Sequence, residues 1–156
     1  MQFTTPVIIP PAPFAISYSD VVMSMGSCFS DNIGRCMQNA FFPIEVNPWG
    51  ILFNPASIAL ALHRVLDGAP YVENDLVFAN GLWHSPEHHG SFSCPNAEET
   101  LRLVNDTLQT MQTHLKKTNR LLLTFGSAWV YERNGRVVAN CHKLPSQQFV
   151  RRRMGV

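Results

Sequence analysis

Short apolar runs alternate along the chain with longer segments of helical spacing. Residues 21–25 and 120–125 indicate strands buried within a sheet, and residues 44–46 form a shorter apolar piece. Residues 97–117 carry one apolar stripe at helical spacing, whereas in residues 55–66 the apolar positions surround most of a helix. This alternation of strands and helices predicts an α/β layered domain with a mostly parallel sheet.

Capping residues mark where the helices begin. Ser30-Asp31-Asn32 can cap a helix over about residues 33–41, because short polar side chains accept hydrogen bonds from the free N–H groups of a first turn. Asn54-Pro55 gives a cap followed by proline at the first helical position, and Asn96 can cap the third helix.

Turn residues and the two ends of the chain complete the pattern. Asn80-Gly81 and Asn134-Gly135 each separate two short strand-like runs, which predicts two β-hairpins. Prolines interrupt residues 1–19, so an extended lead-in is expected there. Residues 147–154 predict the start of a further helix.

Composition is that of a globular protein and gives no sign of an electrostatic binder. Of the 156 residues, 46% are hydrophobic and 15% are charged, and the net charge is +1, so neither a nucleic-acid nor a membrane partner is expected. No run is long and apolar enough to span a bilayer, and the pattern of a signal peptide is missing. The four cysteines form no CxxC pair, so we expect free thiols and a cytoplasmic location.

Candidate chemistry lies where the first apolar run ends, at Gly26-Ser27-Cys28. A glycine permits a tight turn, two small nucleophilic side chains follow, and the N–H groups of a helix start favour negative charge nearby. An ordinary strand–helix turn with a small buried cysteine has the same pattern. The run 120–125 also ends at a glycine, Gly126, and the two turns share one crevice if their strands are neighbours.

Residues 25–30, Met-Gly-Ser-Cys-Phe-Ser, resemble the signature motif of the GSCFA-domain family, with Ser30 where the family usually has alanine. Residues 124–131 and 138–145 also resemble family motifs, so the likeness covers nearly the whole chain. The family is regarded as a distant relative of the SGNH hydrolases, which cleave esters. The resemblance implies a three-layer αβα, SGNH-hydrolase-like α/β fold with a mostly parallel sheet and two β-hairpin insertions.

The resemblance also implies roles for single residues. Alignment with the SGNH motif Gly-Asp-Ser-Leu puts Cys28 at the nucleophile position, and Ser27 takes this role if the turn is shifted by one residue. A cysteine would need a cationic or helix-end environment to form a thiolate, whereas a serine would need a neighbouring base. As oxyanion donors we expect the amide of Gly50 and the side chain of Asn140, although Asn140 could instead only close a turn. Ala128 stands where SGNH enzymes have asparagine.

Among the catalytic groups that the resemblance implies, the general base has no clear counterpart in this sequence. SGNH enzymes and the GSCFA family carry a histidine motif late in the chain, and this sequence stops without one. We therefore expect residues 1–156 to be one GSCFA-like domain that lacks the C-terminal part with the catalytic histidine. His142, in a family-like motif, is the best local substitute, or else it packs beside the site.

A histidine-rich stretch offers a weaker candidate for a metal site. His84, His88 and His89 could bind a transition metal, with Glu87 or Cys94 completing the ligand set. The proline between the first two histidines opposes a helix that would present both on one face, and the His-Glu-x-x-His motif is missing. We therefore expect no metal and no other cofactor.

Two functions of different classes follow. The first is an SGNH-like hydrolase of acyl or acetyl esters, a carbohydrate ester among them, whose partner is a small-molecule ester or glycan substrate. Trp49 and Trp129 then either belong to the core or provide an aromatic wall for a sugar ring. The second is a non-catalytic module that binds a small molecule or carbohydrate in a retained hydrolase cleft. Cys28 in the serine position and Ala128 in the asparagine position favour this second function.

Overall fold

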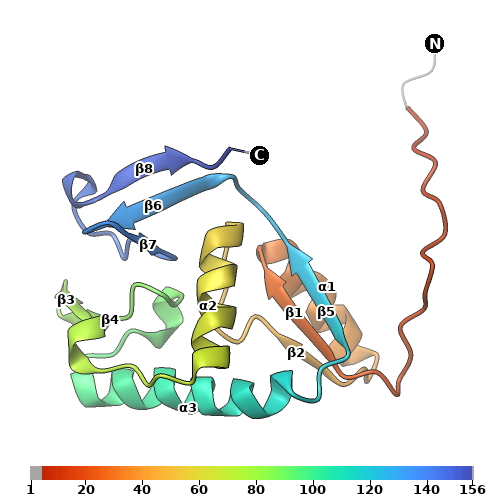
Figure 1. Cartoon of the computed structure of the whole chain (residues 1–156), viewed down its shortest axis with the longest axis horizontal. Helices are drawn as coiled ribbons and strands as arrows, with labels where there is room; N and C mark the ends of the chain where they lie inside the picture. Colours follow the sequence, from red (N-terminus) through yellow and green to blue (C-terminus); the bar gives the residue numbers. More distant parts are fainter. Residues whose placement is uncertain (1–4, 156) are drawn as a thin grey trace.

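The computed structural model describes residues 5–155, which form three α-helices and eight strands (Figure 1). The helices are α1 (Cys28–Asn39), α2 (Pro55–Asp67) and α3 (Ala97–Leu115). The strands are β1 (Val22–Gly26), β2 (Ile44–Val46), β3 (Val77–Ala79), β4 (Leu82–His84), β5 (Arg120–Thr124), β6 (Trp129–Arg133), β7 (Arg136–Val138) and β8 (Val150–Arg153). Short 3₁₀ turns lie at Glu73–Asp75, Gly90–Phe92 and Ser146–Gln148.

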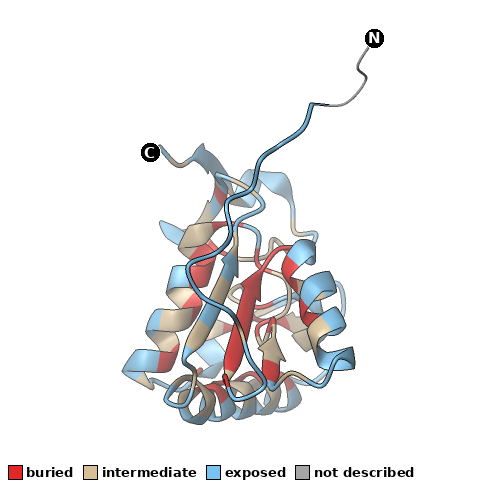
Figure 2. Cartoon of the chain, turned by 90° about the vertical axis from the view of Figure 1, so that its right-hand side faces the viewer, coloured by how far each residue is buried: buried red, intermediate tan, exposed pale blue. Residues whose placement is uncertain are grey.

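The central sheet is parallel, with the strand order β2-β1-β5. Met23 and Met25 of β1 enter a core with side chains of α2 and α3, whereas Ser24, on the opposite face of the strand, hydrogen-bonds to Ser30 of α1. All five residues of β1 are buried, and Figure 2 shows this buried strand between two less buried neighbours. The predicted parallel pairing of strands is therefore present in this sheet.

The other two sheets are antiparallel, so the mostly parallel arrangement holds only for the central sheet. Both predicted hairpins form: β3 pairs with β4 and β6 pairs with β7. The turn residues of each, Asn80-Gly81 and Asn134-Gly135, all have positive φ, as a type I′ turn requires. β8 pairs with the other edge of β6 and completes the sheet β7-β6-β8.

Three predictions were wrong: one of a helix boundary, one of an element type and one of burial. α1 begins at Cys28, five residues before the predicted start, because Ser27 caps it directly after the glycine turn. Residues 150–153 form β8 and not a helix, because they find a strand partner in β6. The strand β5 is not buried on both faces: it is the last strand on its side of the central sheet, and Leu121 and Leu123 are 41% and 39% exposed.

The lead-in has no regular structure in residues 5–19, as its prolines predicted, and residues 1–4 lie outside the described part of the chain. It ends in a turn in which the Ser17 N–H donates to Asp20 Oδ2 at 2.8 Å, and Arg120 of β5 pairs with the same carboxylate at 3.4 Å. Within residues 5–155, no helix has the length and apolar character that crossing a bilayer requires.

Candidate functional site

The end of β1 is a tightly packed corner that only glycine can form. Gly26 has a φ of +144°, and a Cβ at this position would overlap the carbonyl oxygen of Thr124 in β5. The Gly26 N–H donates to Asn47 Oδ1 at 2.8 Å, and its carbonyl accepts from the Leu52 N–H at 2.9 Å. The corner is thus held by β5 on one side and by the loop after β2 on the other.

Ser27, the alternative nucleophile candidate, is buried and makes hydrogen bonds that stabilise the corner. Its side chain is only 8% exposed, and its Oγ accepts from the Phe29 N–H at 3.3 Å, which caps α1. The same hydroxyl lies 3.2 Å from Thr124 Oγ1, within hydrogen-bonding distance. Its N–H donates to the Thr124 carbonyl and side-chain oxygens at 3.2 and 3.1 Å. The Ser27 hydroxyl therefore connects α1 to β5 through its hydrogen bonds.

Cys28, which the motif alignment places at the nucleophile position, is accessible. It is the first residue of α1 and carries an exposed free thiol. The first turn of a helix presents backbone N–H groups with a partial positive charge, which favours an anion at this position. The structure thus separates two adjacent candidates: Ser27 holds the corner, and Cys28 faces solvent at the helix start.

The turns after β1 and β5 meet, as expected for parallel neighbouring strands. A Cβ on Gly126 would lie 3.1 Å from Ser27 Cβ, so the two turns are in direct contact. The N–H groups of Gly126 and Ser127 both donate to the Phe53 carbonyl, at 2.8 and 2.9 Å. A mainly apolar cavity of about 530 Å³ borders Gly126, lined by Pro55, Phe125, Gly126, Ser127, Ala128, Met154 and Gly155.

Gly50 closes the turn that follows β2. Its φ is +75°, and its N–H donates to the Asn47 carbonyl at 2.7 Å, so this amide already has a partner. A Cβ on Gly50 would overlap the side chain of His89, whose N–H donates to the Trp49 carbonyl at 2.9 Å. The glycine therefore allows close packing of the histidine loop against this turn.

Asn140 closes a turn and lies near the same loop. Its Oδ1 accepts from the His142 N–H at 2.9 Å, and its own N–H donates to the Pro86 carbonyl at 3.2 Å. Its Nδ2 lies 3.9 Å from where a Cβ on Gly90 would be. Gly50, His89 and Asn140 thus belong to one loop cluster, and Asn47 links this cluster to the corner through its hydrogen bond to Gly26.

His142 is a buried, hydrogen-bonded residue. Its Nε2 donates to the Ser85 carbonyl at 2.8 Å, and its ring stacks on His84 with centroids 4.5 Å apart. Burial lowers the pKa of His142 to about 4, so the ring is neutral at pH 7. No histidine within residues 5–155 hydrogen-bonds to Ser27 or Cys28.

Two of the three histidines in the candidate metal set, His84 and His88, have ring nitrogens in other hydrogen bonds. The ring nitrogens of His84 bond to Ser93 Oγ at 2.7 Å and to the Ala79 carbonyl at 3.1 Å. His88 is fully buried against aromatic rings, its Nδ1 bonds to Ser85 Oγ at 2.7 Å, and burial lowers its pKa to about 3. Across the part of the chain that the structure describes, no three His, Cys, Asp or Glu residues are arranged to hold a metal ion.

The two tryptophans differ in accessibility. Trp49 is 1% exposed and packs in the core, where its Nε1–H donates to Tyr71 Oη at 3.4 Å. Trp129 is 40% exposed, and the guanidinium of Arg151 lies 3.9 Å from its ring centroid. Of the two, only Trp129 can offer a ring surface to a ligand.

The structure adds His89 to the candidate residues. It is the exposed histidine of the loop cluster; its Nδ1 accepts from the Ser91 N–H at 3.3 Å and lies 3.1 Å from Ser91 Oγ. Its Nε2 makes no hydrogen bond to residues 5–155. The sequence suggested His89 only as a metal ligand, because nothing in it signals the contact with Gly50.

The fold and the corner define a mixed α/β protein with an exposed thiol at the junction of a parallel strand and a helix. The chain belongs to the GSCFA family, whose model matches residues 21–156, as the motif at residues 25–30 had indicated. No curated protein and no solved structure matches it significantly.

Proposed function

We propose that this protein is an ester hydrolase of the SGNH kind that uses Cys28 as its nucleophile and acts on acyl or acetyl esters, including those of carbohydrates. The observation that carries the proposal is the exposed thiol at the first position of α1. The GSCFA signature and the direct contact between the turns after β1 and β5 also support it.

The reaction follows from this placement. The thiol gives its proton to a base, and the sulfur attacks the ester carbonyl, where the N–H groups of the α1 first turn stabilise the negative charge that develops on oxygen. The C–O bond then breaks, and the alcohol leaves with a proton. Water hydrolyses the thioester, which releases the acid and restores the thiol. The apolar cavity beside Gly126 suits an acyl chain.

His89 is the base in this proposal. Among the loop-cluster residues it combines an exposed ring with an Nε2 that has no partner within residues 5–155. Its loop packs on Gly50, in the turn whose Asn47 side chain holds Gly26. His142 is unsuited to the role, because its Nε2–H is bound to a buried carbonyl and its ring resists protonation.

A non-catalytic binding module is the second candidate. Two observations favour it: the Gly50 amide is already hydrogen-bonded, and no histidine of the described chain contacts Cys28 through a hydrogen bond. In this function the corner and the cavity beside Gly126 would bind an ester or glycan without cleaving it.

Hydrolysis of p-nitrophenyl acetate separates the two functions. Cys28→Ala should reduce the rate to background, and His89→Gln should reduce it by about 10²-fold, the usual contribution of a general base. The matched control is Cys36→Ala, which removes another exposed thiol from the same helix and should leave the rate unchanged. Equal background rates for wild type and all variants would instead favour the binding module.

A further inference from the structure

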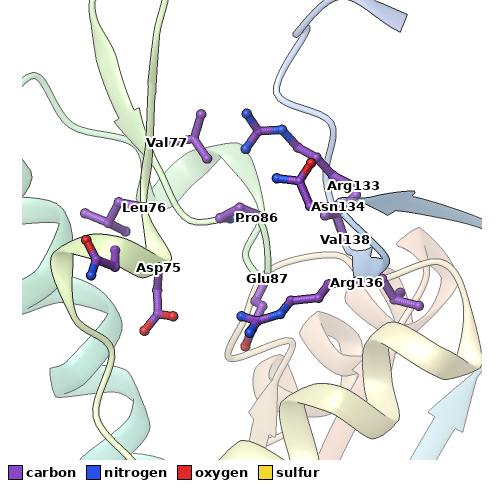
Figure 3. Close-up of a pocket in the computed structure, with 11 residues that line it drawn as sticks. Asp75, Leu76, Val77, Pro86, Glu87, Arg133, Asn134, Arg136 and Val138 are labelled. Atoms are coloured by element: carbon purple, nitrogen blue, oxygen red, sulfur yellow. The ribbon is translucent and has the colours of Figure 1, made fainter. Parts of the chain in front are cut away.

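A second cleft lies between the β6–β7 hairpin and the segments before β3 and after β4 (Figure 3). It has a volume of about 370 Å³, in the range of small-ligand sites. Figure 3 shows three side chains projecting from the hairpin into the cleft: Arg133 toward Val77, Asn134 toward Pro86 and Arg136 toward Glu87. The cleft therefore has a wall of donors on one side.

The two arginines form a like-charged pair. Arg133 and Arg136 are directly opposite each other in the β6–β7 ladder, so their side chains leave the same face of the sheet. Neither forms an ion pair within 4.0 Å with any residue from 5 to 155. Like charges directly opposite in a ladder repel, so this pair costs stability unless an anion lies between the two groups.

The opposite wall offers hydrogen-bond acceptors. Asp75 Oδ2 accepts from the Val72 N–H at 3.0 Å and pairs with Arg64 at 3.1 Å, and Glu87 Oε2 accepts from Tyr71 Oη at 2.8 Å. The second oxygen of each carboxylate makes no hydrogen bond to residues 5–155 and can accept from a ligand hydroxyl. A ligand with one anionic group and several hydroxyls would match both walls.

The cleft shares part of its lining with a larger hollow along α2. Asp75, Glu87, Arg136 and Val137 also line a cavity of about 630 Å³ that follows α2 from Ala56 to Arg64. The residue before Ala56, Pro55, lines the apolar cavity beside the Gly26–Cys28 corner. A helix of this length spans about 20 Å, so the hollows could accommodate several units of a polymer.

From these contacts we propose that the cleft binds a uronic acid unit, with its carboxylate between Arg133 and Arg136 and its hydroxyls at Asp75 and Glu87. An acidic glycan ester held here would extend along α2 toward Cys28. The inference names the substrate class of the proposed hydrolase and rests on that function, but binding at the cleft can be tested without any turnover.

The test is titration of the full chain with D-glucuronate, D-glucose and inorganic phosphate, followed by NMR of the arginine side-chain N–H groups. Glucuronate should bind with a Kd on the order of 1 mM, as for a weak small ligand, and should shift the Arg133 and Arg136 signals. Arg133→Gln or Arg136→Gln should each weaken binding about tenfold, since each removes a charge-assisted hydrogen bond. Arg153→Gln, an exposed arginine outside the cleft lining, should not.

Thermal unfolding gives an independent readout. Without ligand, Arg136→Gln should raise Tm by about 1–3 °C, because it relieves the repulsion. Equal binding of glucose would overturn the role of the arginines, and equal or tighter binding of phosphate would overturn the sugar assignment. No glucuronate binding up to 50-fold above about 1 mM would overturn the whole inference. If glucuronate does not bind but hydrolysis depends on Cys28, the hydrolase proposal stands and the cleft assignment fails. If glucuronate binds but hydrolysis does not depend on Cys28, the cleft assignment stands and the hydrolase proposal fails.

Discussion

Ser27 and Cys28 are adjacent in sequence but lie in different environments, because a helix start turns one side chain inward and the next outward. The hydroxyl faces β5 and caps the helix, whereas the thiol faces solvent. This single step along the backbone decides which of the two side chains is accessible.

Thiol accessibility can be measured directly. Cys28 and Cys36 are exposed, Cys94 is buried and Cys141 is intermediate. We expect two of the four thiols to react rapidly with a disulfide reagent under native conditions, and one in the Cys28→Ala variant. If the rapid count stays at two after this substitution, Cys28 is not accessible and the nucleophile assignment fails. Unfolding in urea should expose all four thiols and supplies the reference.

Gly26 is the residue on which the corner depends most. In Gly26→Ala, the new methyl group would meet the Thr124 carbonyl at a φ of +144°, so both strain and overlap oppose folding. We expect a loss of about 4 kcal/mol or more of unfolding free energy in a urea titration. Gly135→Ala is the matched control: φ is also positive, but the surroundings are open, and about 1–2 kcal/mol is expected. Equal losses would contradict the packing explanation.

At the scale of elements, α1 is fixed at its start by the Ser27 cap and along its length by packing on β2. Gly34 permits this packing, since a Cβ there would lie 2.5 Å from Val46 Cγ2. The same start presents the Cys28 thiol, so the cap and the candidate nucleophile depend on one turn of helix.

The cap can be tested separately from the chemistry. Ser27→Ala removes the acceptor for the Phe29 N–H and should lower the unfolding free energy by about 1 kcal/mol. The thiol remains, so hydrolysis should persist. Ser146→Ala removes an exposed serine hydroxyl that caps nothing, and its effect should stay within about 0.5 kcal/mol. Complete loss of hydrolysis in folded Ser27→Ala would make Ser27 the nucleophile.

At the scale of the whole molecule, buried histidines join the segments that surround the core. His88 packs between Trp49, Tyr71 and Phe92, and His142 ties the segment after β7 to Ser85. Burial lowers both pKa values, to about 3 and about 4, from the ordinary value near 6.5. Both rings are therefore neutral in the folded protein at pH 7.

This burial predicts a loss of stability in acid. Below pH 6.5 the histidines of the unfolded chain bind protons, whereas the buried rings of the folded chain stay neutral. The unfolding free energy therefore has its full value above about pH 6.5 and falls as the pH drops toward 4. At pH 5, His88 alone should account for about 2 kcal/mol. Urea titrations at several pH values between 7 and 4 give the dependence of the unfolding free energy on pH. This dependence should be weaker in His88→Phe than in wild type and unchanged in His63→Gln, which removes an exposed histidine. An identical dependence in all three proteins would contradict the prediction.

Local patterns in the sequence determined most elements of this protein. The apolar run of β1, the Asn-Pro start of α2, the stripe of α3 and both Asn-Gly hairpins were all predictable, because each depends on neighbours within a few residues. The family, too, was recognisable from the residues at 25–30.

Tertiary structure decided what depends on distant segments. β8 is a strand because β6 lies beside it. β5 is partly exposed because α2 and α3 cover β1 but do not cover β5. His89 contacts Gly50, which lies far from it in the sequence. The difference in accessibility between Cys28 and Ser27 also belongs here, because Thr124 and the helix start engage the serine hydroxyl. Hydrogen-bond partners and burial are set by packing between segments, and the local sequence pattern does not contain them.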